Sequence, residues 1–254
     1  MHSSISIIIN NYKQFIETIE YILKSDERFS YNDNMQSAPD CLAECKINSS
    51  NMTLFIKNIN CYVFKFKDCV IENIDENNNK DINSNSHFNF NLNELYHKTV
   101  GLNIKTAIIE LNNSNLKIID SDNDLISVDL KIEPIDKIIY PFRIFEDSLY
   151  DSNSIIDMTQ VYNKITSQKI PELVEILQDK DYISFNDFII NHDKIEINEN
   201  LGNYLKMYIQ TSKILPILSI FNHKDVMVST HWLTTCRFKM VNEDYDLYAE
   251  CSVY

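Results

Sequence analysis

Glycine is almost missing from this chain: only Gly101 and Gly202 occur among 254 residues. The glycine-rich loops that hold nucleotide phosphates, GxGxxG and GxxxxGK[ST], are therefore excluded. Tight turns must use Asn and Asp instead, because these residues tolerate positive φ and hydrogen-bond their own backbone. The abundance of Asn, Ile, Lys and Asp indicates an AT-rich coding genome.

The sequence also lacks long apolar runs. No stretch reaches the length of a membrane-spanning helix. The apolar run at residues 5–9 is too short for a signal peptide and has no basic flank. We therefore expect an intracellular protein in a reducing compartment, with its six cysteines as free thiols.

Positive charge is in short supply, since 23 Lys and Arg face 37 Asp and Glu for a formal net charge of −14. A uniformly acidic surface would repel nucleic acid. Any nucleic-acid-binding function therefore requires the cations to gather on one face and the acids to lie elsewhere.

The sequence contains no recognisable catalytic or metal-binding motif. Four cysteines could form a zinc site on paper, but their spacing lacks a CxxC pair: Cys41, Cys45, Cys61 and Cys69. The DSDND segment at residues 120–124 begins like a calcium loop but lacks the glycine and the closing glutamate, so a β-turn explains it better. We predict a protein without catalysis, cofactor or metal, while a catalytic group assembled only in space stays an alternative.

An internal repeat constrains the architecture most. Residues 88–132 and 205–254 each read as a short strand, one helix, and three strands with alternating apolar residues. The first copy contains NELYHKTVGL as its helix, and the second contains QTSKILPILSIF, with Pro216 predicted in the first helical turn.

The remaining segments extend this pattern. A strand at residues 4–9 precedes a helix that Asn10 or Asn11 caps and that ends near Lys24. Strands follow within residues 45–67, and residues 73–86 form a polar surface loop. A strand at residues 154–158 precedes a helix over residues 159–168 with Thr159 as its cap, and further strands follow it.

Four helices thus divide two and two around residues 133–145, an apolar segment with Pro134 and Pro141. This order predicts an α+β fold of two pseudo-symmetric domains, residues 1–132 and 146–254, with residues 133–145 as an extended connector.

This order of elements resembles the sliding DNA clamps, the proliferating cell nuclear antigen family with its viral relatives. INSSNMTLFIKNI at residues 47–59 is similar to the family's I/M-x-S-S-x-V-x-L segment, and YLKMYIQTSKILPILSIFNHKDVMVSTHW at residues 204–232 is similar to its C-terminal part. The resemblance implies two sliding-clamp-like domains, each with two helices packed on antiparallel sheets. A divergent viral member would fit the composition.

The resemblance also implies a function. Chains of the family associate head to tail into a ring whose helices line the hole. We therefore expect a homotrimeric, non-enzymatic DNA polymerase processivity factor that encircles double-stranded DNA without reading its sequence. It would bind polymerase and other clamp-binding peptides in the nucleus or at a viral replication site. By family position, the candidate edge strands for ring closure lie at residues 125–132 and 182–188, although internal strands of one sheet would also explain these segments.

Two sets of residues are implied as sites. DNA contacts would come from helical lysines: Lys13, Lys24, Lys98, Lys164, Lys169, Lys213 and Lys224. The partner-peptide groove beside the connector would use apolar residues: Ile47, Met52, Ile135, Ile138 and Tyr140. Ordinary solvated helix faces, with cations favoured near helix C-termini, would also explain the lysines. A packed linker would also explain the isoleucines.

Two other functions stay open at this stage. A clamp-fold processivity or late-transcription factor could hold DNA by charge alone without forming a ring. An unrelated α+β enzyme or interaction protein would instead show a bound metal or a deep pocket lined by His and acids.

Overall fold

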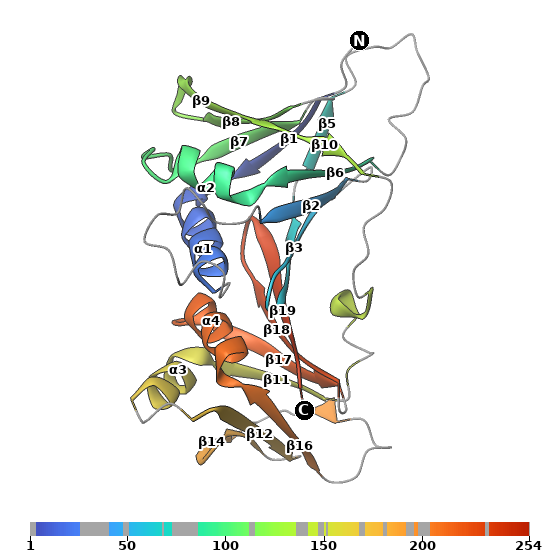
Figure 1. Cartoon of the computed structure of the whole chain (residues 1–254), viewed down its shortest axis with the longest axis vertical. Coiled ribbons are helices and arrows are strands. Elements are labelled where there is room, and N and C mark those ends of the chain that lie inside the picture. Colours follow the sequence, from blue (N-terminus) through green and yellow to red (C-terminus); the bar gives the residue numbers. More distant parts are fainter. Residues whose placement is uncertain are drawn as a thin grey trace. The chain divides into compact units, whose positions relative to one another are not determined.

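The computed structural model describes residues 4–25, 41–47, 51–67, 69–72, 86–111, 115–135, 142–146, 150, 152–167, 171–179, 182–191, 196–197, 204–231 and 234–253 (Figure 1). The chain divides into two compact units. The first contains Met1–Asn58, Val63–Tyr140 and Val241–Asp246, and the second contains Ile59–Tyr62, Pro141–Met240 and Leu247–Tyr254. Ile59–Tyr62, from the N-terminal half of the sequence, thus belongs to the second unit, and Val241–Asp246, from the C-terminal half, belongs to the first. The predicted domain boundaries stay a prediction.

Twelve elements make up most of the first unit among its described residues. They are β1 (Ser4–Ile9), α1 (Tyr12–Lys24), β2 (Leu42–Ile47), β3 (Met52–Lys57), β4 (Cys61–Phe66), β5 (Cys69–Glu72), β6 (Ser86–Asn91), α2 (Leu92–Thr99), β7 (Ala107–Leu111), β8 (Asn115–Asp120), β9 (Asn123–Lys131) and β10 (Glu133–Pro134). β4 begins in the second unit, and Val241 and Tyr245–Asp246 also belong to the first. One antiparallel sheet has the strand order β5-β1-β7-β8-β9, and other strands are ordered β10-β6-β2-β3-β4.

The second unit repeats this plan. Its elements are a short 3-10 helix η2 (Phe142–Phe145), β11 (Ser152–Asp157), α3 (Met158–Thr166), β12 (Leu173–Asp179), β13 (Tyr182–Phe185), β14 (Phe188–Asn191), β15 (Glu196–Ile197), β16 (Tyr204–Gln210), α4 (Thr211–Phe221), β17 (Asp225–His231), β18 (Thr235–Val241) and β19 (Tyr245–Ser252). One sheet has the order β14-β13-β12-β16, and other strands are ordered β19-β18-β17-β11-β15.

Equivalent backbone hydrogen bonds show that the two units repeat the same arrangement of strands and helices. Tyr12 N, at the start of α1, donates to Lys105 O at 2.9 Å, and Met158 N, at the start of α3, donates to Lys224 O at 3.0 Å. In the same way, the first residues of α2 and α4 donate to the residues just before β2 and β12, at 2.8 and 3.0 Å. The predicted repeat and the α+β fold with two helices per unit are thus confirmed.

Side-chain caps explain where three of the helices begin. Asn11 Oδ1 accepts from Gln14 N at 3.2 Å, Asn91 Oδ1 accepts from Glu94 N at 3.1 Å, and Asp157 Oδ1 accepts from Thr159 N at 2.9 Å. Such caps satisfy amide groups that have no partner within the helix. The cap of α1 matches the prediction.

Two predicted details of the helices are wrong. Asp157 caps α3, not Thr159, because the carboxylate accepts the Thr159 amide and the helix begins one residue earlier. Pro216 lies inside α4, not in its first turn, because α4 begins directly after β16 at Thr211. The proline ring therefore removes one intrahelical hydrogen bond.

The cores follow from the alternation of the strands and the stripes of the helices. In the first unit, Phe15 of α1 lies 5.4 Å from Phe64 and 5.8 Å from Phe66 between ring centroids, in edge-to-face contacts. Tyr245 completes this cluster at 5.2 Å from Phe64. In the second unit, Phe221 of α4 stacks on Phe238 of β18 at 6.3 Å. Figure 1 shows α1 beside α2, and α3 beside α4.

A buried carboxylate ties the turn between β18 and β19 to the start of α1. Asp244, 6% exposed, accepts from Asn10 N at 3.0 Å and from Asn10 Nδ2 at 2.8 Å through Oδ1. Its Oδ2 accepts from Asn11 N at 3.0 Å. A charged acceptor therefore holds the backbone amides of Asn10 and Asn11 at the start of α1. Hydrogen bonds to a charged acceptor are stronger than those to a neutral one.

We expect Asp244→Ala to lower the free energy of unfolding by about 2–3 kcal/mol, because it removes a buried carboxylate that accepts three part-buried hydrogen bonds. Urea denaturation followed by circular dichroism measures this change. Asp122→Ala, at an exposed turn position, is the control and should change stability by less than about 0.5 kcal/mol. Equal effects of the two substitutions would contradict the role given to Asp244.

Candidate nucleic-acid interface

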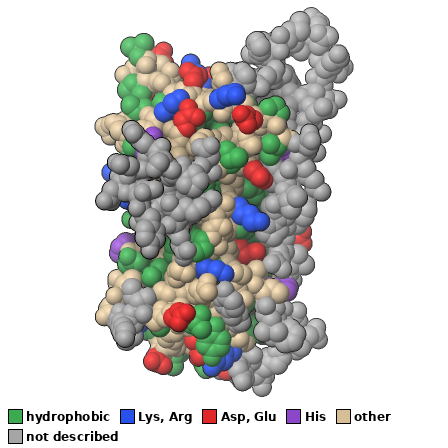
Figure 2. Space-filling model, viewed as in Figure 1, with side chains coloured by type: hydrophobic (Ala, Val, Ile, Leu, Met, Phe, Trp, Pro, Cys, Tyr) green, Lys and Arg blue, Asp and Glu red, His purple; other side chains and the backbone are tan. Residues whose placement is uncertain are grey.

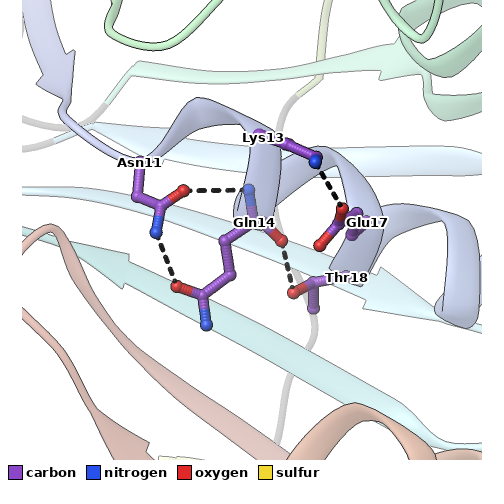
Figure 3. Close-up of polar contacts among 5 residues, drawn as sticks. All are labelled: Asn11, Lys13, Gln14, Glu17 and Thr18. Carbon is purple, nitrogen blue, oxygen red and sulfur yellow. Dashed lines mark hydrogen bonds and ion pairs between the residues drawn. The ribbon is translucent and has the colours of Figure 1, made fainter.

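The predicted DNA contacts begin with α1, and Figure 3 shows polar contacts in its first turns. Lys13 is exposed, and its Nζ lies 3.8 Å from Glu17 Oε1, one helical turn away. The cap of α1 is a separate local network, because Asn11 Nδ2 also donates to Gln14 Oε1 at 3.1 Å. Lys13 therefore presents its charge next to a carboxylate and not alone.

The other lysines of the first unit are paired in the same way. Lys24 Nζ donates to Glu20 Oε1, and this hydrogen bond raises the pKa of Lys24. Lys98 Nζ lies 2.7 Å from Glu94 Oε1 and donates to Asp129 O at 2.8 Å. Each pair has i,i+4 spacing on a helix surface, where such pairs form readily.

The lysines of the second unit have a different environment. Lys164 lies on α3 and is half-exposed; no ion pair with it is found within the described part of the chain. Lys213 Nζ, on α4, donates to Ser252 Oγ at 2.7 Å, so β19 holds this side chain in place. Lys224 follows α4, and its carbonyl accepts the amide of Met158. Lys169 lies outside the described residues.

The helices are more positive than the rest of the chain. Together they carry five lysines and three glutamates, a formal charge of +2. Because the whole chain carries −14, the remainder carries −16. Figure 2 shows basic and acidic side chains interspersed on one face of the molecule. The described helices thus carry a small positive formal charge, and the acidic excess lies in the rest of the chain.

Each unit also presents an edge strand. In the first unit β9 pairs with β8 and ends its sheet, as predicted. In the second unit the edge is β14; β13 is internal, because it pairs with both β12 and β14. The predicted edge at residues 182–188 is therefore corrected. The segment folds back at Asn186, whose φ of 54° makes a tight turn.

Three of the four buried cysteines are poorly reactive. Burial raises the pKa of the Cys45 and Cys236 thiols, and that of Cys251 to about 12, so these cysteines are not nucleophilic near neutral pH. Among the described residues, no cluster of His, Cys, Asp or Glu is arranged for a metal ion. Asp120 lies at the β8–β9 turn, where its Oδ1 accepts from Asp122 N. None of the described helices has the length and apolar character needed to cross a bilayer.

Comparison with solved structures identifies the fold. The chain matches the proliferating cell nuclear antigen (PCNA) of Thermococcus kodakaraensis with a TM-score of 0.67 and 10% identity, over 98% of this chain and 100% of that one. It has the sliding-clamp fold. A. fulgidus PCNA, in a structure with the C-terminal region of FEN-1 bound, matches with a TM-score of 0.67 at 9% identity over 98% of both chains. Entamoeba histolytica PCNA matches with a TM-score of 0.65 at 9% identity, over 99% of this chain and 98% of that one.

Sequence comparison alone does not reach this result, since no protein-family model and no curated protein matches the chain. The likeness to the sliding clamps is therefore one of structure, carried by the order and pairing of the elements.

Within the sliding-clamp fold, the predicted groove residues have different exposures. Ile47 and Met52 form a cross-strand pair between β2 and β3, and both are 2% exposed. Ile135 is half-exposed, and its amide donates to His87 O at 3.0 Å. Ile138 and Tyr140 lie outside the described residues, as does most of the predicted loop at residues 73–86. The role of all five in partner binding stays a prediction.

Two features of this clamp fold escaped the sequence analysis. Ser252 holds Lys213, but it lies 39 residues away in the sequence, and no local pattern connects them. The edge strand β14 could have been found, because Asn186 and Asp187 are turn residues between two apolar runs.

Proposed function

We propose that this protein is a sliding clamp: a non-enzymatic, homo-oligomeric ring that encircles duplex DNA and tethers DNA polymerase and other replication or repair proteins. The observation that carries this proposal is the sliding-clamp fold over nearly the full length of this chain and of its structural neighbours. A clamp needs no catalytic group, since it holds DNA by enclosing it. Its place of action would be an intracellular site of replication, nuclear or viral.

The edge strands support the oligomer. β9 in one unit and β14 in the other each end a sheet, so copies can pair head to tail through these two edges. The family resemblance favours three copies. The structure of A. fulgidus PCNA with the C-terminal region of FEN-1 supports peptide tethering as the second activity.

The helices support a weak hold on DNA. Their formal charge is +2 in an otherwise acidic chain. A sliding protein requires contacts with phosphates that do not depend on sequence and that exchange easily. The acids elsewhere on the chain would keep DNA from binding to other surfaces.

Topological retention on DNA tests this function. The protein is incubated with nicked circular duplex at low salt and then washed at about 1 M salt, where charge attraction is screened within about 3 Å. We expect retention on the circle, release when the circle is cut once, and a solution mass of three times 29.8 kDa by light scattering. A strict monomer with no retention on closed circles would overturn the proposal. Salt-sensitive binding, equal on linear and circular DNA, would favour a non-ring DNA-binding factor.

A further inference from the structure

We propose that the outward face of the sheet β5-β1-β7-β8-β9 is a docking surface for a basic amphipathic helix of a partner protein (Figure 1). Its centre is an apolar band of four residues on four neighbouring strands: Val70, Ile8, Ile108 and Ile119. The inference goes beyond the proposed function, because the predicted partner groove lies on β2 and β3, in another sheet. It does not require the chain to form a ring.

Three isoleucines form a row across the middle of this sheet. Ile8 of β1 lies opposite Ile108 of β7, and Ile108 lies opposite Ile119 of β8. Side chains directly opposite each other on one face of an antiparallel sheet are close enough to touch. Ile8 is 48% exposed and the other two are half-buried, whereas the residues on either side of each along its strand are at most 6% exposed. The row therefore lies on the face that points away from the core.

Exposed apolar side chains lie at both ends of this row. Val70 of β5, 51% exposed, lies opposite Ser6, and Ser6 is two residues from Ile8 on the same face of β1. Val70 is thus a diagonal neighbour of Ile8, within reach of a large side chain. At the other end, Leu125 of β9 is 89% exposed and lies two residues from Ser127, the partner of the last isoleucine. The band is therefore continuous from β5 to β8, and β9 adds a leucine beside it.

The dimensions and direction of the band favour a helix as the occupant. Four neighbouring strands span three gaps of about 4.8 Å, or about 14 Å, and a helix of about 10 residues has this length. The apolar stripe of an amphipathic helix would lie along the band. An extended peptide cannot add here as a strand, because β1 and β7 already pair on both sides.

The second unit shows that the fold does not require such a band. In the corresponding strands β11, β17 and β18, the row that begins with the exposed Ile155 continues to Met227 and then to Lys239. The Lys239 nitrogen lies 5.5 Å from the ring centroid of Tyr248, so a cation interrupts the row. A contiguous exposed apolar surface rimmed by polar residues is typical of an interaction site.

The charges around the band select a basic partner. Asp122 and Asp124 are exposed at the β8–β9 turn, and among the described residues neither takes part in an ion pair. Beside the isoleucines, Lys117 lies opposite both Glu110 and Asp129, which leaves one acid in excess. Lysine or arginine on the flanks of the docked helix would meet these carboxylates, and nucleic acid would be repelled by them.

Binding of designed peptides tests this assignment. The probe is a fluorescein-labelled helix of about 18 residues of leucine and lysine, with the leucines on one face, because shorter isolated helices are marginal in water. A second peptide has glutamate in place of lysine, and a third has alanine in place of leucine. Fluorescence anisotropy measures each affinity. We expect one leucine–lysine peptide to bind per chain, and the other two to bind at least about tenfold more weakly.

Two pairs of serine substitutions with similar exposure locate the binding. Ile8→Ser with Val70→Ser breaks the band, and Ile155→Ser with Leu173→Ser removes side chains that are 64% and 43% exposed from the second unit. We expect the first pair to weaken binding of the leucine–lysine peptide about tenfold or more, and the second less than about twofold. Ile8→Thr with Val70→Thr serves if the serine pair unfolds in circular dichroism, because threonine is β-branched and suits a strand.

The acidic rim is tested with a matched change of charge. Asp122→Asn with Asp124→Asn should weaken binding of the leucine–lysine peptide at least about threefold. Glu172→Gln with Asp187→Asn removes the same charge at exposed positions of the second unit and should leave the affinity within about twofold. Equal effects of the two pairs would show attraction to the acidic chain as a whole and would overturn the choice of a basic partner.

The remaining outcomes separate this inference from the proposed function. Peptide binding that is unchanged by the serine pair on the band overturns the docking surface. A lower mass of that pair in light scattering, without peptide binding by the wild-type protein, overturns it as well and assigns the face to a second copy. Loss of retention on circles with peptide binding intact overturns the clamp alone. Retention on circles by the serine pair, with its peptide binding lost, supports a docking surface separate from the clamp activity.

Discussion

Replacing Arg237 with methionine will lower the free energy of unfolding by about 3–5 kcal/mol. Arg237 is 0% exposed and lies on β18 in the second unit. Its Nη1 donates to Ile144 O at 3.0 Å, and its Nη2 donates to Ser229 Oγ at 2.7 Å. Methionine fills similar volume but leaves both acceptors buried without a donor, and each such group costs about 1–3 kcal/mol.

The surroundings of the guanidinium explain why a cation is tolerated there. Its central carbon lies 4.0 Å from the ring centroid of Tyr150 and 6.0 Å from that of Tyr248, a cation–π arrangement that contributes about 2 kcal/mol when it is shielded from water. Tyr150 in turn donates to Glu250 Oε2 at 2.9 Å. The arginine thereby fixes η2, the C-terminal end of the predicted connector, to β18.

The measurement uses the single tryptophan, Trp232, whose position in the sequence falls within the second unit. Urea denaturation followed by its fluorescence reports the loss of stability, and hydrogen exchange at residues 142–146 reports the release of η2. Arg237→Lys is the matched variant. It keeps the charge but cannot make the forked pair of hydrogen bonds, so we expect it to lose at least half as much stability as methionine. Unchanged exchange at residues 142–146 in both variants would contradict the anchoring role.

Much of the fold could be predicted because it depends on local patterns. The repeat at residues 88–132 and 205–254 matches β6 to β9 and β16 to β19, with α2 and α4 in their places. Alternation along strands and Asn11 at the start of α1 are local signals of this kind. The resemblance to the sliding clamps followed from the order of these elements and is confirmed as a fold.

The side-chain partners of the charged residues could be predicted from the sequence only in part. The ion pairs of Lys13, Lys24 and Lys98 could have been predicted, because a glutamate lies four residues from each. The burial of Arg237 could not, because its partners Ile144 and Ser229 lie on other elements.

Placing a glutamate at Ile189 will dissociate the proposed oligomer into single chains. Ile189 lies on the edge strand β14, whose sequence is FIIN, and it is 58% exposed. An exposed apolar edge strand is prone to pair with another chain. The facing strand of the next copy, proposed to be β9, carries the exposed Asp124, Asp129 and Lys131, a net negative charge, so a carboxylate added at Ile189 would be repelled.

The sign of the introduced charge distinguishes β9 from other partners. If β9 is the facing strand, Ile189→Lys will retain more of the oligomer than Ile189→Glu, because lysine can pair with the aspartates of β9. Ile8→Glu is the matched control, since Ile8 is 48% exposed but lies on β1, which pairs on both sides. Light scattering over a range of protein concentrations measures the mass of each variant against the 29.8 kDa of one chain. Equal masses for the lysine and glutamate variants would exclude β9, and dissociation by Ile8→Glu would show that the effect is not specific to the edge.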